Sequence, residues 1–369
     1  MSNNQKPLVI LTAGGTGGHV FPADSLAEEL SARGYDLALV TDSRGKDNYH
    51  GKLGEITNYS VLAGALVGKS KLFKIKSLFK TGIGVLQAAR ILLKRKPVCV
   101  VGFGGYASFP CCMAAILLGI DLVIHEQNSV MSRTNRFLSK YASFIGQSFN
   151  NVKYTPSRTK KILTGMPIRK NIADLNKQTY APRNNNQKFQ LLIIGGSQGA
   201  KIFGEVIPAA IKNLPTDIQK QMQIFHQCRK DDIDSVKQGY VGCLADLTIS
   251  HFFDNMADLY AQTNLIISRA GASSIAEITA AKLPSIIIPL PTAADDHQTT
   301  NAQSIAENKA GYVLAQKDFT SEKLSSLLNQ IISDKELLLQ MSENSGKLSI
   351  IDASNRLANA IEKEIISKK

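Results

Sequence analysis

The stretch Leu8-Val-Ile-Leu-Thr12, followed by Ala13-Gly-Gly-Thr-Gly-Gly-His19, decides the fold. Its first five residues predict a buried strand, and residues 22–31 have the apolar spacing of a helix. Glycines in such a turn let the backbone approach a phosphate or a sugar, and the helix start offers N–H groups to an anion. A tight turn without a ligand is the simpler alternative for a single loop of this kind.

The order of strand, glycines and helix recurs at residues 98–110 and 189–200, and another strand is expected at 122–128. Alternating strands and helices predict parallel sheets covered on both faces, so the fold class is α/β with two Rossmann-like, doubly wound domains. Three glycine loops after strands favour nucleotide binding over three ligand-free turns. The loops at 14–18 and 195–199 lack the G-x-G-x-x-G register, which argues against a nicotinamide cofactor.

Length and composition agree with two globular domains. Hydrophobic residues make up 44% of the chain and charged residues 20%, a composition unlike that of disordered proteins. Its 369 residues are more than one hydrophobic core usually supports. The polar residues 183–188 are expected to form a loop or linker, and the apolar run at 109–120 is too short to span a bilayer. We expect no signal peptide, and five cysteines without a C-x-x-C pair favour a reduced, cytosolic compartment.

The net charge of +13 lies in one half of the chain. Residues 1–173 carry 23 basic and 9 acidic side chains, whereas residues 174–369 carry 20 and 21. Nine Lys or Arg and no acidic residue occur between Ile56 and Ile120. The first half is therefore expected to face an anionic partner.

Residues 69–80 interleave lysines with Leu, Ile and Phe at helical spacing. A broad apolar stripe flanked by Lys is typical of a helix that lies on anionic lipid. A helix packed on the core would explain the stripe but not the lack of acids, and no nucleic-acid-binding motif is present. We therefore predict a membrane contact made by Lys69, Lys71, Leu72, Phe73, Lys74, Ile75, Lys76, Phe79 and Lys80.

Two groups of polar residues in the first half are candidates for chemistry. His19 closes the first glycine loop and could accept a proton from an attacking hydroxyl, or could cap the helix start. His125-Glu-Gln-Asn128 ends a strand, where open α/β sheets bind ligands. Some of these four, such as His125 or Gln127, are expected only to brace loops.

The second half offers a turn and a polar loop. Residues 268–277 place small side chains at a strand-to-helix turn, which could hold a diphosphate while Glu277 binds a ribose diol; a capped helix with a solvated Glu is the alternative. Asp295-Asp-His-Gln298, with Asn301, could bind sugar hydroxyls. These residues supply too few oxygens for a hard cation, and we assign no metal and no cofactor.

Together these motifs resemble one family. The runs at 11–23, 102–110, 125–129, 165–169, 195–200 and 269–277 are similar, in sequence and in order, to the bacterial N-acetylglucosaminyltransferases of glycosyltransferase family 28. The resemblance implies a GT-B architecture, two Rossmann-like domains facing across a cleft. It also implies metal-free, inverting transfer of N-acetylglucosamine from UDP-N-acetylglucosamine to the C4 hydroxyl of undecaprenyl-pyrophosphoryl-MurNAc-pentapeptide (lipid I), which gives lipid II of peptidoglycan.

The resemblance also assigns site residues by motif position. His19 is the candidate general base and Asn128 is expected to hold sugar or acceptor, while Glu126 or a loop backbone is the alternative to His19. The acceptor side comprises Gly104, Gly105, Tyr106 and Ser108. The residues expected to bind UDP-N-acetylglucosamine are Thr16, Gly17, Gly18, Asn128, Arg169, Ser197, Phe253, Ala272, Ser273, Ser274, Glu277 and Gln298.

The family also implies domains, partners and location. We expect an acceptor and membrane domain at 1–166, joined by a C-terminal helix at about 350–369, and a donor domain at 167–349. The expected location is peripheral, on the cytoplasmic face of the inner membrane, with lipid I and anionic lipid as partners. Cell-wall synthesis enzymes are candidate partners, and nucleic acid is not. The alternatives are a transferase for a small hydrophobic acceptor and a non-catalytic nucleotide-binding protein.

Overall fold

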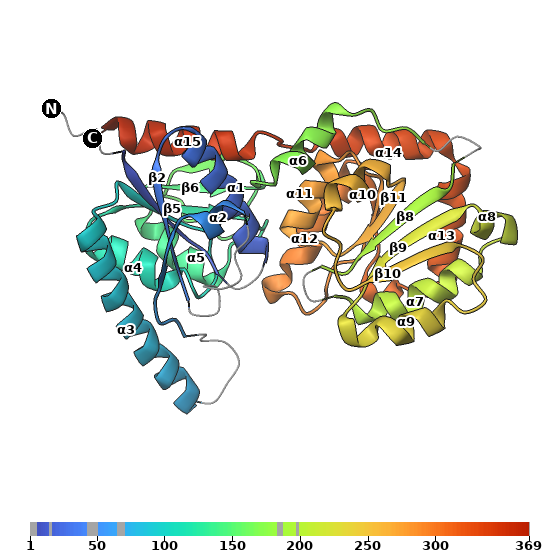
Figure 1. The fold of residues 1–369 in the computed structure, drawn as a ribbon, viewed down its shortest axis with the longest axis horizontal. Coiled ribbons are helices and arrows are strands. Elements are labelled where there is room, and N and C mark those ends of the chain that lie inside the picture. Colours follow the sequence, from blue (N-terminus) through green and yellow to red (C-terminus); the bar gives the residue numbers. More distant parts are fainter. Residues whose placement is uncertain are drawn as a thin grey trace. The chain divides into compact units, whose positions relative to one another are not determined.

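The structure is a computed structural model, and Figure 1 shows its fold. It describes residues 6–14, 17–42, 51–64, 71–182, 187–196 and 199–368. Three predicted site or membrane residues lie outside this part of the chain: Thr16, Ser197 and Lys69. The side chains of four more also lie outside it: Lys71, Leu72, Phe73 and Lys74.

The chain divides into two compact units. Unit 1 comprises Met1–Arg169 and Asp352–Lys369, and unit 2 comprises Lys170–Ile351. Each unit has its own sheet and its own core, as expected for a chain of this length. Among the helices in the described ranges, none is long and apolar enough to cross a membrane.

Unit 1 contains a seven-stranded parallel sheet in the order β3-β2-β1-β4-β5-β6-β7. Its strands are β1 (Leu8–Thr12), β2 (Asp36–Thr41), β3 (Thr57–Ser60), β4 (Cys99–Gly102), β5 (Asp121–Glu126), β6 (Phe144–Gln147) and β7 (Lys161–Leu163). Its helices include α1 (Gly17–Ala32), α2 (Lys52–Glu55), α3 (Lys71–Arg95), α4 (Phe109–Leu117), α5 (Arg133–Leu138) and α15 (Ala353–Glu364).

Alternation along β1 explains how the helices cover this sheet. Val9 and Leu11 pack in one core with α1 and α15, whereas Leu8 and Ile10 pack in another with α3 and α4. The last helix is fixed to this unit by polar contacts, since Arg33 Nη1 lies 2.7 Å from Glu362 Oε2 and Tyr35 donates to Glu362 Oε1 at 3.1 Å. Unit 1 therefore includes residues from both ends of the sequence.

Unit 2 contains a six-stranded parallel sheet in the order β10-β9-β8-β11-β12-β13. Its strands are β8 (Phe189–Ile194), β9 (Met222–Gln227), β10 (Asp246–Ser250), β11 (Leu265–Ser268), β12 (Ser285–Ile287) and β13 (Gly311–Val313). Its helices include α6 (Lys170–Ala173), α7 (Lys201–Lys212), α8 (Thr216–Lys220), α9 (Ile233–Gly239), α10 (Met256–Gln262), α11 (Ala272–Ala280), α12 (His297–Glu307), α13 (Ser321–Ser333) and α14 (Lys335–Lys347).

The two strand orders confirm the predicted α/β class and its Rossmann-like halves. The order reverses between β1 and β4 in unit 1, and between β8 and β11 in unit 2. Helices lie on both faces of each sheet in Figure 1. In open sheets of this type, ligands bind beyond the carboxyl ends of the strands at such a reversal.

Candidate active site

The carboxyl edge of the unit 1 sheet gathers three of the predicted segments. Strand β4 pairs with β1 on one side and with β5 on the other, so the loops that follow these strands leave the same edge. In the sequence, the first glycine run follows β1 and residues 103–108 follow β4, while the polar run from His125 to Asn128 begins with the last two residues of β5. The topology therefore places residues far apart in sequence beside one another.

His19 lies in the first turn of α1, after Gly17 and Gly18, and is half-buried. Its Nδ1 lies 3.2 Å from Oε1 of Gln127, which follows β5. The opposite edge of the ring lies against the turn after β4: a Cβ built on Gly105 would be 3.4 Å from His19 Cδ2 and 3.6 Å from Nε2. Gly104 and Gly105 have φ of 85° and 76°, a conformation that favours glycine, so this turn can approach the imidazole closely.

Behind Gln127 lies a second imidazole, that of the fully buried His125. The Gln127 amide nitrogen lies 3.2 Å from His125 Nδ1 and donates to the His125 carbonyl at 3.1 Å. His125 Nε2 lies 3.0 Å from the carbonyl oxygen of Gly165. Burial lowers the pKa of His125 to about 4, so this imidazole is neutral at physiological pH.

Glu126 is fully buried, and both of its carboxylate oxygens accept hydrogen bonds. Oε1 accepts from the backbone N–H of Asn128 at 3.0 Å and from its side-chain amide at 3.4 Å. Oε2 accepts from the backbone N–H of Ser132 at 3.1 Å and from the amide of Asn135 at 2.8 Å. These contacts favour a role for Glu126 in holding the loop and Asn128, rather than as the base.

Asn135 was not identified from the sequence. It is buried in α5, where its backbone N–H donates to Ser132 Oγ at 3.3 Å, and its side chain joins Glu126 to the His125 carbonyl. A Cβ on Gly104 would lie 3.2 Å from the Asn135 amide nitrogen. The available signal in the sequence was Ser132, which lies three residues before Asn135 at the spacing of a helix N-cap.

The other predicted residues of unit 1 line the same edge. Tyr106 donates to Asp42 Oδ2 at 3.4 Å, and the buried Ser108 donates to the Gly105 carbonyl at 3.0 Å, which braces the glycine turn. Arg169, predicted to bind nucleotide, is the last residue of the first segment of unit 1, and its guanidinium lies 5.3 Å from the centre of the Phe21 ring of α1.

In unit 2, α7 follows β8 and α11 follows β11, so both helices begin at the carboxyl edge of the sheet. Within the described part of the chain no side chain caps α7 or α11. The Phe203 N–H of α7 donates to the Ala200 carbonyl at 2.9 Å, whereas the first N–H groups of α11 are available to an anion. Ala272, Ser273 and Ser274 form the first turn of α11, and Ser273 Oγ is buried without a hydrogen-bond partner among the described residues. The turn at the start of α11 therefore remains the predicted diphosphate site.

Gln298, in the first turn of α12, connects two of the loops at this edge. Its Oε1 accepts from the backbone N–H of Ala270 at 3.2 Å and from that of Leu290 at 3.0 Å. The amide oxygen is thus used within the protein, which leaves the amide N–H groups as the donors that a sugar hydroxyl could meet. Asn301, also in α12, donates to the Ala270 carbonyl at 3.1 Å.

Arg269 braces the same loops, a role that the sequence did not predict. Its guanidinium donates to the carbonyls of Ile288 and Pro289 at 3.1 and 3.3 Å, and to Gln316 Oε1 at 2.8 Å. Burial lowers the pKa of Arg269, yet three acceptors surround its charge. Arg269 therefore fixes backbone at this edge.

Glu277 and Phe253 also have partners within unit 2. Tyr260 donates to Glu277 Oε2 at 3.1 Å, and Glu277 is 8% exposed. The Phe253 ring contacts Phe225 edge-on, with 6.1 Å between centres. Tyr260 was not identified from the sequence, because it is 17 residues from Glu277 on another helix.

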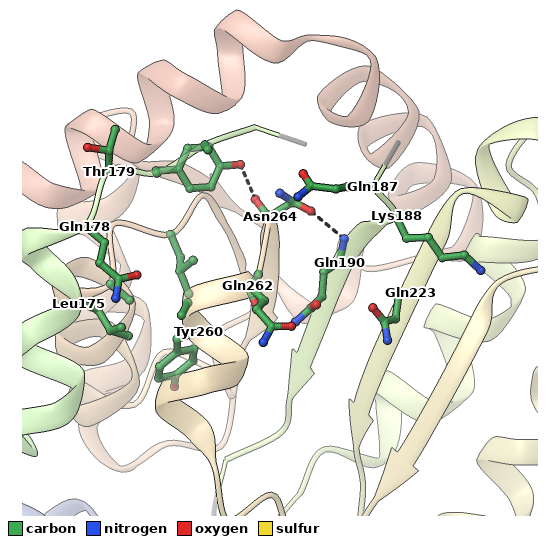
Figure 2. A pocket seen from close by; sticks show the side chains of 16 residues that line it. Leu175, Gln178, Thr179, Gln187, Lys188, Gln190, Gln223, Tyr260, Gln262 and Asn264 are labelled. Atoms are coloured by element: carbon green, nitrogen blue, oxygen red, sulfur yellow. Dashed lines mark hydrogen bonds between the residues drawn. The ribbon is translucent and has the colours of Figure 1, made fainter. Parts of the chain in front are cut away.

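A hollow of about 560 Å³ lies at the opposite, amino edge of the unit 2 sheet (Figure 2). Its labelled lining is rich in amides, among them Gln178, Gln190, Gln223, Gln262 and Asn264. Gln190 and Gln223 lie near the starts of β8 and β9, so the hollow is separate from the predicted donor residues at the strands' carboxyl ends.

Comparison with known proteins shows the family of this chain. Residues 9–147 match the glycosyltransferase family 28 N-terminal domain, and residues 190–361 match the family's C-terminal domain. The chain is 40% identical over 361 residues, 97% of each chain, to the UDP-N-acetylglucosamine–N-acetylmuramyl-(pentapeptide) pyrophosphoryl-undecaprenol N-acetylglucosamine transferase of Paramagnetospirillum magneticum. It is 39% identical to the protein of that name from Rhodospirillum centenum, over 96% of this chain and 93% of that one.

A solved structure with similar coverage is that of MurG from Acinetobacter baumannii. It matches with a TM-score of 0.76 and 31% identity, over 97% of this chain and 99% of that one. A glycosyltransferase of kitacinnamycin, at 14% identity and a TM-score of 0.72 over 98% and 100% of the two chains, shares the fold. The chain therefore belongs to glycosyltransferase family 28, among the UDP-N-acetylglucosamine–N-acetylmuramyl-(pentapeptide) pyrophosphoryl-undecaprenol N-acetylglucosamine transferases.

Proposed function

We propose that this chain transfers N-acetylglucosamine from UDP-N-acetylglucosamine to the C4 hydroxyl of MurNAc in undecaprenyl-pyrophosphoryl-MurNAc-pentapeptide, with inversion at the anomeric carbon. The observation that carries this proposal is the match to relatives of that name over nearly the whole length of both chains. The site geometry supports it, because a histidine lies at the carboxyl edge of one sheet, and α7 and α11, which no described side chain caps, begin at that of the other. The small-acceptor and non-catalytic alternatives have no comparable support.

The two units offer complementary chemistry for this reaction. On unit 1, His19 takes the proton from the acceptor hydroxyl as the hydroxyl oxygen attacks the anomeric carbon, and Asn128 holds sugar or acceptor. On unit 2, the first N–H groups of α7 and α11 stabilise the negative charge that develops on the UDP diphosphate as the glycosidic bond breaks. Glu277 binds the ribose and the Gln298 amide binds sugar hydroxyls.

Replacing His19 tests this assignment. We expect His19→Gln to lower kcat by about a thousandfold, since general-base catalysis contributes about 10²–10⁴. UDP affinity should stay within about twofold, because the proposed diphosphate holder is on unit 2. The measurement is transfer of radiolabelled N-acetylglucosamine to a lipid I analogue, with UDP binding followed by calorimetry. Near-normal turnover would exclude His19 as the base, and transfer only to a soluble aglycone would exclude the lipid acceptor.

We also propose that the first turns of α3 bind the surface of an anionic membrane, on the cytoplasmic face. Ile75, Leu78 and Phe79 are 64%, 65% and 72% exposed, and Lys76 and Lys80 beside them are exposed too. The core of unit 1 takes Ala88 and Leu92 from the later turns of this helix, so the apolar side chains at its start are not needed for packing. An exposed apolar patch flanked by Lys fits lipid headgroups and acyl chains.

Charge reversal on α3 tests the membrane proposal. Because each Lys near an anionic bilayer contributes about 1 kcal/mol, Lys76→Glu with Lys80→Glu should weaken binding to phosphatidylglycerol-containing vesicles by about thirtyfold or more. Turnover of a water-soluble acceptor should be retained. The matched control is Lys94→Glu with Arg95→Glu, the same charge change at the other end of α3. Equal losses in the two double variants, or none in the first, would contradict the proposed surface.

A further inference from the structure

We propose that Gln127 and His125 are positioning residues that fix the tautomer of His19, so that its Nδ1 carries the hydrogen and its Nε2 is the atom that accepts the acceptor's proton. This inference rests on the proposed function for the role of His19. The hydrogen-bond chain itself is a property of unit 1 and can be tested without turnover.

The chain begins at a group that can only accept. The carbonyl oxygen of Gly165 lies 3.0 Å from His125 Nε2, so Nε2 must carry a hydrogen. His125 is fully buried, and burial lowers its pKa to about 4, so the imidazole has one hydrogen only. His125 Nδ1 is therefore an acceptor.

The orientation of the Gln127 amide follows from His125. Two acceptors face its amide nitrogen, His125 Nδ1 at 3.2 Å and the His125 carbonyl oxygen at 3.1 Å. If the amide were flipped, its oxygen would face His125 Nδ1 and the His125 carbonyl oxygen. Two acceptors would then face a third with no hydrogen between them, which is costly in a buried site. Gln127 is 2% exposed, so water does not compensate for that loss.

With the amide so oriented, its Oε1 faces His19 Nδ1 at 3.2 Å. An amide oxygen only accepts, so Nδ1 of the neutral His19 carries its hydrogen and Nε2 carries the lone pair. The Nε2 edge of the ring lies along the Gly104–Gly105 turn, on the predicted acceptor side. In a histidine that acts as a base, the hydrogen bond made by one ring nitrogen sets which nitrogen carries the hydrogen. A histidine in the wrong tautomer cannot take the proton at the required atom.

The direct test is the tautomer of His19 in the full-length protein. The chain has six histidines, and long-range ¹H–¹⁵N correlation spectra of ¹⁵N-histidine-labelled protein at pH 8 distinguish the two nitrogens of each ring; His19 is assigned by its loss in His19→Gln. We expect the Nδ1–H tautomer of His19 in the wild type. In Gln127→Met, which removes the acceptor, the Nε2–H tautomer should become the major form. An Nε2–H wild type, or no change in Gln127→Met, would overturn the proposal.

Turnover gives the second readout. Gln127→Met should lower kcat by about tenfold or more while KM for UDP-N-acetylglucosamine stays within about twofold. Gln262→Met, the same change at an exposed residue of the hollow in unit 2, is the matched control and should behave as wild type. A wild-type kcat in Gln127→Met with an unchanged His19 tautomer would count against positioning. A tautomer change without loss of kcat would instead refute His19 as the base and leave the hydrogen-bond chain intact.

Discussion

The carboxyl edges of the two sheets differ in which chemical groups they present. At the edge of unit 1, the candidate base is oriented by other side chains: His19 contacts Gln127, and Gln127 contacts His125. At the edge of unit 2, side chains such as Gln298 and Arg269 contact backbone and fix the loops that precede α11 and α12. A proton acceptor needs one oriented atom, whereas a diphosphate is held by several N–H groups, so each edge suits its proposed half of the reaction.

Each unit contains a buried histidine, and the two differ in whether they connect to the candidate base. Their protonation gives the largest expected effect on the free energy of unfolding. His125 connects through Gln127 to the half-buried His19, whereas His226 of β9 lies 3.0 Å from the Tyr240 hydroxyl inside unit 2. Burial lowers the pKa of both imidazoles to about 4, so the unfolded chain binds more protons than the folded chain below about pH 6.5. Each should thus contribute about 3 kcal/mol of stability, present above pH 6.5 and lost as the pH falls to 4.

Urea unfolding between pH 7.5 and 4 checks this expectation. His226→Phe, which keeps a ring in the core, should remove about half of the loss in unfolding free energy over that range, although its stability at pH 7.5 is lower than that of the wild type. An unchanged dependence on pH would show that His226 does not resist protonation in the folded state.

The two units each contain a buried glutamate, Glu126 and Glu277, and substituting these residues should have effects of intermediate size. Glu126 accepts four hydrogen bonds, two of them from backbone N–H groups, so Glu126→Gln places an amide against donors and should lower the free energy of unfolding by about 2 kcal/mol. Glu277→Gln should cost less stability but weaken UDP binding, since Glu277 is the proposed ribose ligand. Thermal unfolding and calorimetry measure both. A Glu126→Gln variant with normal stability and no turnover would restore Glu126 as the candidate base.

The smallest expected effect is at Gln298. Gln298→Met removes the acceptor for two backbone N–H groups as well as the proposed sugar donors, and should weaken UDP-N-acetylglucosamine binding by about tenfold, or about 1.4 kcal/mol. The His19 tautomer should be unaffected, because Gln298 belongs to unit 2 and the hydrogen-bond chain to unit 1. Calorimetric titration with donor and with UDP alone separates the sugar contact from loosening of the loops, since loose loops would weaken both ligands equally.

Much of the fold could be predicted because its signals are local. Apolar runs of strand length that end in glycines correctly identified β1, β4 and β8. The identity of His19, Asn128 and Gln298 as candidates followed from their places after strands and at helix starts. Asn135 and Tyr260 were missed because their only signal is a contact with a residue on another element.

The sequence by itself determined the α/β class, the two halves, the basic first half and the family. Only the tertiary structure decided which polar groups meet. His19 meets Gln127, and His125 meets the carbonyl of Gly165. Glu126 meets the side-chain amide of Asn135. The physical reason is that strand and helix propensities depend on near neighbours, whereas the direction of a hydrogen bond depends on burial and on the group opposite. A backbone carbonyl of Gly165, which no side-chain pattern can reveal, sets the direction of the hydrogen-bond chain that ends at His19.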